Sequence, residues 1–229
     1  MADHPRDRPA WNALNSLQSH HARRNSHAVR FDPEIGPLSA ARVHDEAGLA
    51  ALADLAAPDE ILAFIERGPV PLPPGMMLER QSPAVQMAAD EAPAPFDHPD
   101  IIPLGDADVS EMRALAEMTK PGPFASRTHV LGQFWGIRDG DGRLIAMAGE
   151  RMRMPGHGEV SAVCVHPDAQ GRGLGKLMVR KAMANLGAQG LRPFLHAYAD
   201  NEAAIGTYRR CGFTLRSDMI ITMFRKAVS

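Results

Sequence analysis

Hydrophobic and polar positions follow regular patterns mainly in the second half of the chain. Residues 101–104 form a short apolar run that predicts a β-strand. The segment 106–119 opens with an aspartate suited to cap a helix and then places apolar side chains at helical spacing. Those side chains are Val109, Met112, Leu115 and Ala116. Two further apolar runs, 132–138 and 143–154, flank an Asp/Gly turn and predict a β-hairpin.

A strand, a glycine-rich loop and a helix are expected next, in that order. Residues 159–165 alternate little between apolar and polar positions, which indicates a strand covered on both faces. The helix begins directly after the glycines, because an apolar stripe starts there. The stripe consists of Leu174, Leu177, Met178 and Ala182. A last strand at 193–199 is followed by a second helix that opens near Asn201.

The first half of the chain is less regular. Residues 1–30 are polar and predict a flexible or loosely packed arm, or a short helix. Residues 31–99 predict an acidic, proline-rich extension or small subdomain, either separate or packed on the main sheet. Within it, 46–65 predicts two short helices and 76–87 a strand. The main domain is expected at 100–229.

Composition indicates a globular protein. The chain has 229 residues, of which 45% are hydrophobic and 23% charged, enough for one large domain or two small ones. No apolar run approaches the roughly 18–20 residues of a membrane helix. The N-terminus lacks the apolar core of a signal peptide, so the cytoplasm is the expected location. Cys164 and Cys211 are too few for a disulfide framework and are expected to be reduced thiols.

Charge is divided unevenly along the chain. Residues 31–125 hold 5 basic and 17 acidic residues, a net charge of −12, whereas residues 126–229 hold 15 and 8, a net charge of +7. The C-terminal part is therefore suited to an anionic ligand. Nucleic acid is not the expected ligand, because only 5% of residues are aromatic and no basic run exceeds two residues. No membrane partner and no metal site are expected.

The glycine-rich loop is the segment most suited to binding a phosphate. Glycines at 171, 173 and 175 let the backbone approach a ligand closely, and the following helix directs its N–H groups and dipole at the same place. A P-loop is excluded, because Gln170 stands where its first glycine belongs and Leu177 follows Lys176. A dinucleotide fingerprint also fails, since Lys176 or Met178 occupies its last glycine position.

The pattern Gln170-x-x-Gly173-x-Gly175 resembles the signature of the GNAT superfamily of N-acyltransferases, whose acyl-CoA pyrophosphate sits on this loop. The stretch 200–213 is similar to a second signature of the family: an asparagine that opens a helix, a small apolar pair, a tyrosine and then Gly-Phe. The likeness covers about residues 101–227. Within the superfamily, the sequence of residues 159–175 is most similar to the branch related to glycine N-acyltransferases. It implies an α/β fold with a mixed, mostly antiparallel sheet, helices on both faces and two splayed parallel strands.

The resemblance also implies which residues bind acetyl-CoA, the acyl donor. Backbone amides of the loop, with Lys176, would hold the pyrophosphate, and the pantetheine arm would lie along the preceding strand. The asparagine of the second signature would touch CoA. The implied residues are Val163, Cys164, Val165, Gln170, Gly171, Arg172, Gly173, Gly175, Lys176, Asn201 and Ala204.

Two side chains are the predicted catalytic groups. Tyr208 lies seven residues after Asn201 on the same helix, and a phenol is a suitable acid for a thiolate leaving group. Glu159 stands eleven residues before Gln170, where many family members place the glutamate that takes the amine proton. Glu150, or water alone, is the alternative base. Acylation of Cys164 is not expected, because the sequence fixes no histidine beside it.

The leading hypothesis is an acetyl-CoA-dependent N-acetyltransferase that transfers the acetyl group directly to an amine. The alternative is a non-catalytic module that binds or senses acyl-CoA. The presence of both Glu159 and Tyr208 favours the enzyme. The sequence leaves the acceptor amine open, a small molecule or a peptide, and it leaves the oligomeric state open, a homodimer included.

Overall fold

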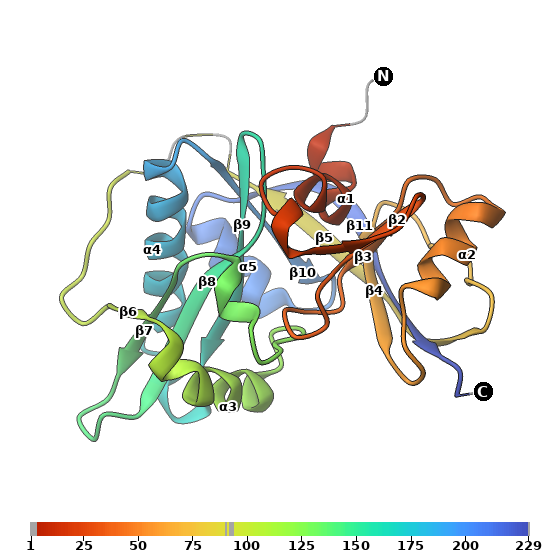
Figure 1. Ribbon diagram of the computed structural model, residues 1–229. Helices are drawn as coiled ribbons and strands as arrows, with labels where there is room; N and C mark the ends of the chain where they lie inside the picture. The colour runs from red at the N-terminus through yellow and green to blue at the C-terminus, as the bar shows by residue number, and fades with distance from the viewer. Residues whose placement is uncertain (1–3, 90, 92–93, 229) are drawn as a thin grey trace.

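An eight-stranded sheet forms the centre of the computed structural model, which describes residues 4–89, 91 and 94–228 (Figure 1). Across the sheet the strands are β4 (Ile61–Glu66), β11 (Thr214–Lys226), β5 (Met76–Ala88), β10 (Arg192–Tyr198), β9 (His157–Val165), β8 (Leu144–Met154), β7 (Phe134–Arg138) and β6 (Ile102–Leu104). Neighbours are antiparallel except β9 and β10, which are parallel. The predicted mixed, mostly antiparallel sheet is confirmed.

The parallel pair β9–β10 separates after a short contact. Only residues 192–194 pair with 157–159, and beyond that point β10 pairs with β5 alone. On its other side β9 carries a bulge, since Ala162 and Val163 stand opposite the single residue Ala148 of β8. Ala162 has φ +50°, an uncommon value for a residue with a side chain. A bulge bends its strand, which opens the sheet at this place.

Helices cover both faces of the sheet, as predicted. Adjacent residues of β10 face opposite sides: Leu195 packs in the cluster that contains α4, and Phe194 packs in the one that contains α1. The five α-helices described are α1 (Pro9–Leu14), α2 (Glu46–Asp54), α3 (Val109–Thr119), α4 (Leu174–Ala188) and α5 (Glu202–Arg210). Five 3₁₀ turns complete the described helical segments, at Pro5–Asp7, Ser19–His21, Asp106–Asp108, Thr128–Leu131 and Pro167–Ala169. None of the described helices has the length and hydropathy to traverse a bilayer.

The first half of the chain completes the main sheet. The strand β5 lies between β10 and β11, and β4 forms the far edge. A small second sheet of β1 (Ala22–Arg24), β2 (Ala28–Phe31) and β3 (Ser39–Ala41) packs nearby. The segment predicted as an arm or short helix contains α1, in which Ala13 and Leu14 are fully buried. From the segment 31–99, β4 and β5 therefore belong to the main sheet.

One predicted element is wrong. The segment 46–65 predicts two helices, and the first is α2, but the second is the strand β4. Leu62 and Phe64 pack into one cluster while Ala63 and Ile65 pack into another, so the run is buried on both faces. A continuous apolar run of this length fits a strand covered on both faces as well as a helix. Here the run forms a strand because it pairs with β11.

Candidate active site

The loop before α4 presents a row of free backbone amides. The amide of Gln170 bonds to the carbonyl of Pro167 at 3.3 Å, and that of Leu177 bonds to Gly173 at 3.2 Å. Between them, the amides of 171–176 donate to no acceptor in the described part of the chain. Gly171 and Gly173 have φ of +75° and +78°, which glycine adopts without strain. Six unpaired donors beside a helix N-terminus form a site for an anion such as a diphosphate.

A groove of about 650 Å³ runs from this loop between β9 and α5. It contains most of the residues expected to hold acetyl-CoA: Val163, Val165, Gln170, Gly171, Gly173, Gly175, Lys176 and Ala204. Three of the expected residues lie outside its lining: Arg172, Cys164 and Asn201, which lines the smaller cavity described next. Arg172 is exposed at the loop, and Cys164 is buried in the cluster beneath α3.

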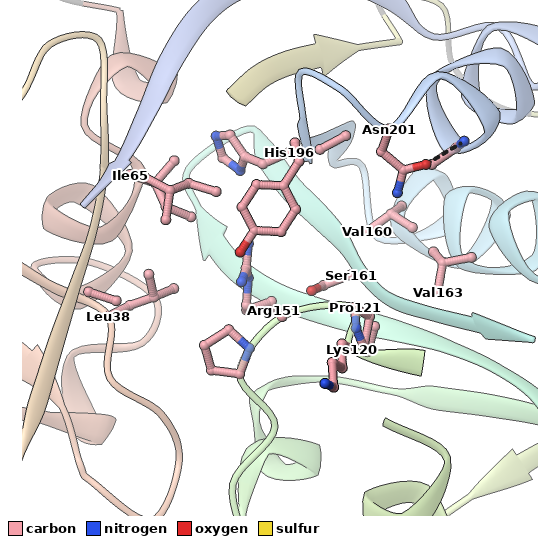
Figure 2. Close-up of a pocket in the computed structure, with 18 of the residues that line it drawn as sticks. Leu38, Ile65, Lys120, Pro121, Arg151, Val160, Ser161, Val163, His196 and Asn201 are labelled. Atoms are coloured by element: carbon pink, nitrogen blue, oxygen red, sulfur yellow. Dashed lines mark hydrogen bonds between the residues drawn. The ribbon is translucent and has the colours of Figure 1, made fainter. Parts of the chain in front are cut away.

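A second, smaller cavity of about 160 Å³ continues from the groove (Figure 2). The two share Thr119, Val163, Ala204 and Tyr208, so they form one passage. Its walls come from distant parts of the chain. Figure 2 shows Leu38 and Ile65 on one side and, on the other, Arg151 from β8 with Ser161 and His196 from the splayed strands β9 and β10.

Tyr208 lies at the junction of the two spaces. Its ring packs edge-on against Phe213, with 6.3 Å between centroids. Burial, with smaller contributions from Cys164 and Cys211, raises the pKa of Tyr208 to about 12. Its hydroxyl makes no hydrogen bond to any described residue, so it remains protonated and available to a ligand. Asn201 lines the smaller cavity, and its Oδ1 caps α5 by accepting from the Ala204 amide at 3.1 Å.

Glu159 is buried completely and its carboxylate is fully engaged. It accepts from Arg151 Nε at 2.8 Å and Nη2 at 2.6 Å, from His196 Nδ1 at 2.7 Å and from the Met152 amide at 3.3 Å. Burial alone would raise the pKa of Glu159, but the charge and hydrogen bonds of Arg151, with the hydrogen bond of His196, lower it to about 2. Glu159 is absent from the described lining of both cavities. This geometry suits a group that holds Arg151 and His196 in place.

Glu150, the alternative base, faces the other side of the sheet. Its Oε1 accepts from Asn185 Nδ2 at 2.7 Å and Gln189 Nε2 at 3.0 Å, both associated with α4. The thiol of Cys164 is not suited to act as a nucleophile, because burial raises its pKa to about 12 and keeps it protonated.

The sequence pattern assigned no role to Arg151 and left His196 open between a core residue and a site residue. His196 donates from Nδ1 to Glu159, and its Nε2 lies 2.9 Å from Gln86 Nε2. The Oε1 of Gln86 accepts from Arg216 at 2.8 Å, so the amide nitrogen faces His196 and the histidine nitrogen is the acceptor. A signal for Arg151 was present: Arg151 and Glu159 stand at similar distances from the Pro155–Gly156 turn, which brings them together across a hairpin.

Comparisons with known proteins agree with this geometry. Residues 104–213 match the family described as "Acetyltransferase (GNAT) family". A solved structure from Novosphingobium aromaticivorans, described as a GNAT-family acetyltransferase, is 45% identical and covers 99% of this chain and 100% of that chain, with a TM-score of 0.92. A GCN5-related N-acetyltransferase from Kribbella flavida is 18% identical over 96% of this chain and 95% of that chain, with a TM-score of 0.63, and so shares the fold.

A mycothiol acetyltransferase from Mycobacterium sp. (strain JLS) is 34% identical over 125 residues, which are 52% of this chain and 38% of that protein. This chain thus spans well under half the length of that relative. The structural match over the whole chain establishes the relationship, and the chain belongs to the GNAT family of acetyltransferases.

Proposed function

We propose that this protein is an N-acetyltransferase that transfers the acetyl group of acetyl-CoA directly to an amine. One observation carries the proposal: six unpaired amides at 171–176 open into a passage that leads to the free hydroxyl of Tyr208. The first feature suits the diphosphate of the donor, and the second suits protonation of its leaving thiolate. The family membership supports the same reaction.

The residues of the groove fit acetyl-CoA as a substrate. The diphosphate would lie on the amides of 171–176, where Lys176 and Arg210 add positive charge. Val163 and Val165 are half-exposed towards the groove, on the part of β9 that has parted from β10. That edge offers unpaired strand backbone to the amide groups of the pantetheine arm. Asn201 retains its side-chain NH₂ for the same ligand, because only its Oδ1 is used in capping.

In the reaction, a neutral amine attacks the thioester carbon, the C–N bond forms and the C–S bond breaks. Tyr208 donates its proton to the departing sulfur, and the ammonium product of the attack gives a proton back to the phenolate or to water. We assign no base role to Glu159, whose hydrogen-bonding capacity is taken by Arg151 and His196. The acceptor amine instead loses its proton to water before the attack.

We further propose that, within the family, the protein is related to the glycine N-acyltransferases. This part of the proposal rests on the sequence of residues 159–175 alone, because none of the relatives described above is a glycine N-acyltransferase by name.

The test is a screen for CoA release from acetyl-CoA with amino acids, polyamines, aminoglycosides and peptides as acceptors. We expect release that depends on both substrates, and calorimetric binding of acetyl-CoA in the absence of acceptor. Binding without release across the whole panel would instead support the non-catalytic binding module. Absence of binding would contradict the assignment of the 171–176 amides.

A further inference from the structure

The smaller cavity differs from the groove in the charge of its lining. Arg151 and Lys120 line it, together with His196, and no aspartate or glutamate is among its described lining residues. The remaining wall is largely apolar and includes Leu38, Ala63, Ile65, Ile221 and Met223. The lining therefore offers hydrogen-bond donors to an anionic group and no carboxylate to a cationic amine.

Arg151 is placed to bind a second carboxylate. Glu159 occupies its Nε and one position of Nη2, in the paired geometry that guanidinium and carboxylate favour. The Nη1 of Arg151 donates to no described residue, and 14% of the side chain is exposed, into the cavity that it lines. A guanidinium carries five N–H donors, so donors remain for a ligand. Glu159 and His196 fix the orientation of this side chain from behind.

The mouth of the cavity is also basic. A neighbouring hollow of about 490 Å³ shares Lys120 and Tyr198 with it, and Arg80 and Arg113 line the hollow as well. Neither Arg113 nor Lys120 forms an ion pair within the described residues, and Arg80 bonds only to Ser82 and stacks 4.7 Å from the Tyr198 ring. Glu117 is the single acidic side chain in the described lining of this hollow.

We infer that the acceptor is a small amine that carries a carboxylate, of the α-amino-acid class with an apolar side chain. This inference rests on the proposed function and assigns Arg151 as the residue that binds the acceptor carboxylate. The amine then lies towards Tyr208, where the passage meets the donor groove. The apolar wall receives the side chain, and a volume of about 160 Å³ is close to the roughly 150 Å³ cavity that accommodates benzene.

The first experiment compares ligands that differ only in charge, on the unmodified protein. Leucine, leucinamide and spermidine serve as acceptors with acetyl-CoA, and N-acetyl-leucine and N-acetyl-leucinamide serve as product ligands in the presence of CoA. We expect kcat/KM for leucine, and the affinity for its acetylated product, to exceed those of the amides by about tenfold or more. Leucinamide has the less basic amine, so reactivity alone would favour the amide and cannot create this result.

Three variants test which residues produce the preference for leucine over leucinamide. Arg151→Lys keeps the charge but loses the guanidinium fork, and should lower the leucine-to-leucinamide ratio about tenfold. Lys120→Asn should lower it about threefold, since asparagine tolerates the left-handed φ of +48° at this position. Lys181→Asn, on the far helix α4 where the lysine pairs with Asp97 at 2.9 Å, should leave the ratio unchanged.

Failure of this inference is distinguishable from failure of the proposed function. Equal or better use of leucinamide or spermidine would overturn the inference and leave the acetyltransferase intact. If acetyl-CoA binds but no amine is acetylated, the activity is wrong, and the product-ligand comparison still decides whether this cavity prefers a carboxylate. An unchanged ratio in Arg151→Lys would remove Arg151 from acceptor binding.

Discussion

The two ends of the passage are built in different ways. At the donor end, consecutive backbone amides of one loop, shaped by its glycines, form the centre of the site, and Lys176 and Arg210 add charge to it. At the acceptor end, side chains from distant segments meet, among them Leu38, Ile65, Arg151 and His196 (Figure 2). A site made by one loop can remain constant while a composite site changes residue by residue. This division lets one fold retain its donor and vary its acceptor.

The largest expected effect is at the junction of the two ends. Tyr208→Phe removes the acid and should lower kcat about 10²- to 10³-fold, because general acid catalysis contributes within this range. The Kd for acetyl-CoA should stay within about twofold, since no other contact is lost. Steady-state kinetics and calorimetry measure the two quantities. Unchanged turnover would remove the hydroxyl from the mechanism.

The next effect concerns the support of the acceptor end. Glu159 has its pKa lowered to about 2 in the folded protein, against a usual value near 4.3, so it stabilises the fold above pH 4.3 and this contribution is lost as the pH falls towards 2. Glu159→Gln should cost about 3 kcal/mol in the free energy of unfolding at pH 7. Denaturant titrations from pH 7 to pH 3 should show a smaller decline for the variant than for the parent.

The same variant tests the chemistry of Glu159. We expect the pH profile of kcat/KM to follow the acceptor amine in both proteins, because Glu159 takes no proton in the reaction. Rescue of the variant by raised pH, relative to the parent, would restore Glu159 as the base.

At the donor end the expected effect is smaller and confined to CoA. Gly173→Ala introduces a side chain at φ +78° beside the free amides and should weaken acetyl-CoA binding about tenfold. Gly190→Ala is the matched control, since Gly190 has φ +73° and open space around it but lies outside both cavities. Equal losses of affinity in both variants would indicate general strain.

The smallest effect is a change of acceptor preference. Ile65→Val widens the apolar wall and should shift kcat/KM towards acceptors with one more methylene by about fivefold, with acetyl-CoA binding unchanged. Ile137→Val deletes the same group at a similarly buried position in the α4 cluster, away from both cavities, and should not change the preference. A shift of equal size in both would contradict the assignment of this wall.

The sequence predicted the donor end far better than the acceptor end. The glycine loop, the strand before it and the helix after it are contiguous, so local pattern and turn chemistry suffice to predict them. The acceptor wall depends on β4 and β11, and pairing over long sequence distances decides where these strands lie. The periodicity of 46–65 could not show that Ile65 would face a cavity. Burial also depends on tertiary packing. The spacing therefore placed Glu159 on the correct strand, but it could not show that the side chain is buried and paired with Arg151.

The position of β5 has a practical consequence for any dissection of this molecule. The family match begins at residue 104, yet β10 pairs with 84–88, and β11 pairs with β5 over nearly its entire length. A fragment trimmed to the matched residues, 104–213, would lack β4, β5 and β11, so that β10 would become an edge of the sheet. The edge of β10 that pairs with β5 would then be exposed to solvent, and such a fragment should self-associate when expressed. The segment that matches the family is therefore shorter than the segment needed to complete the sheet.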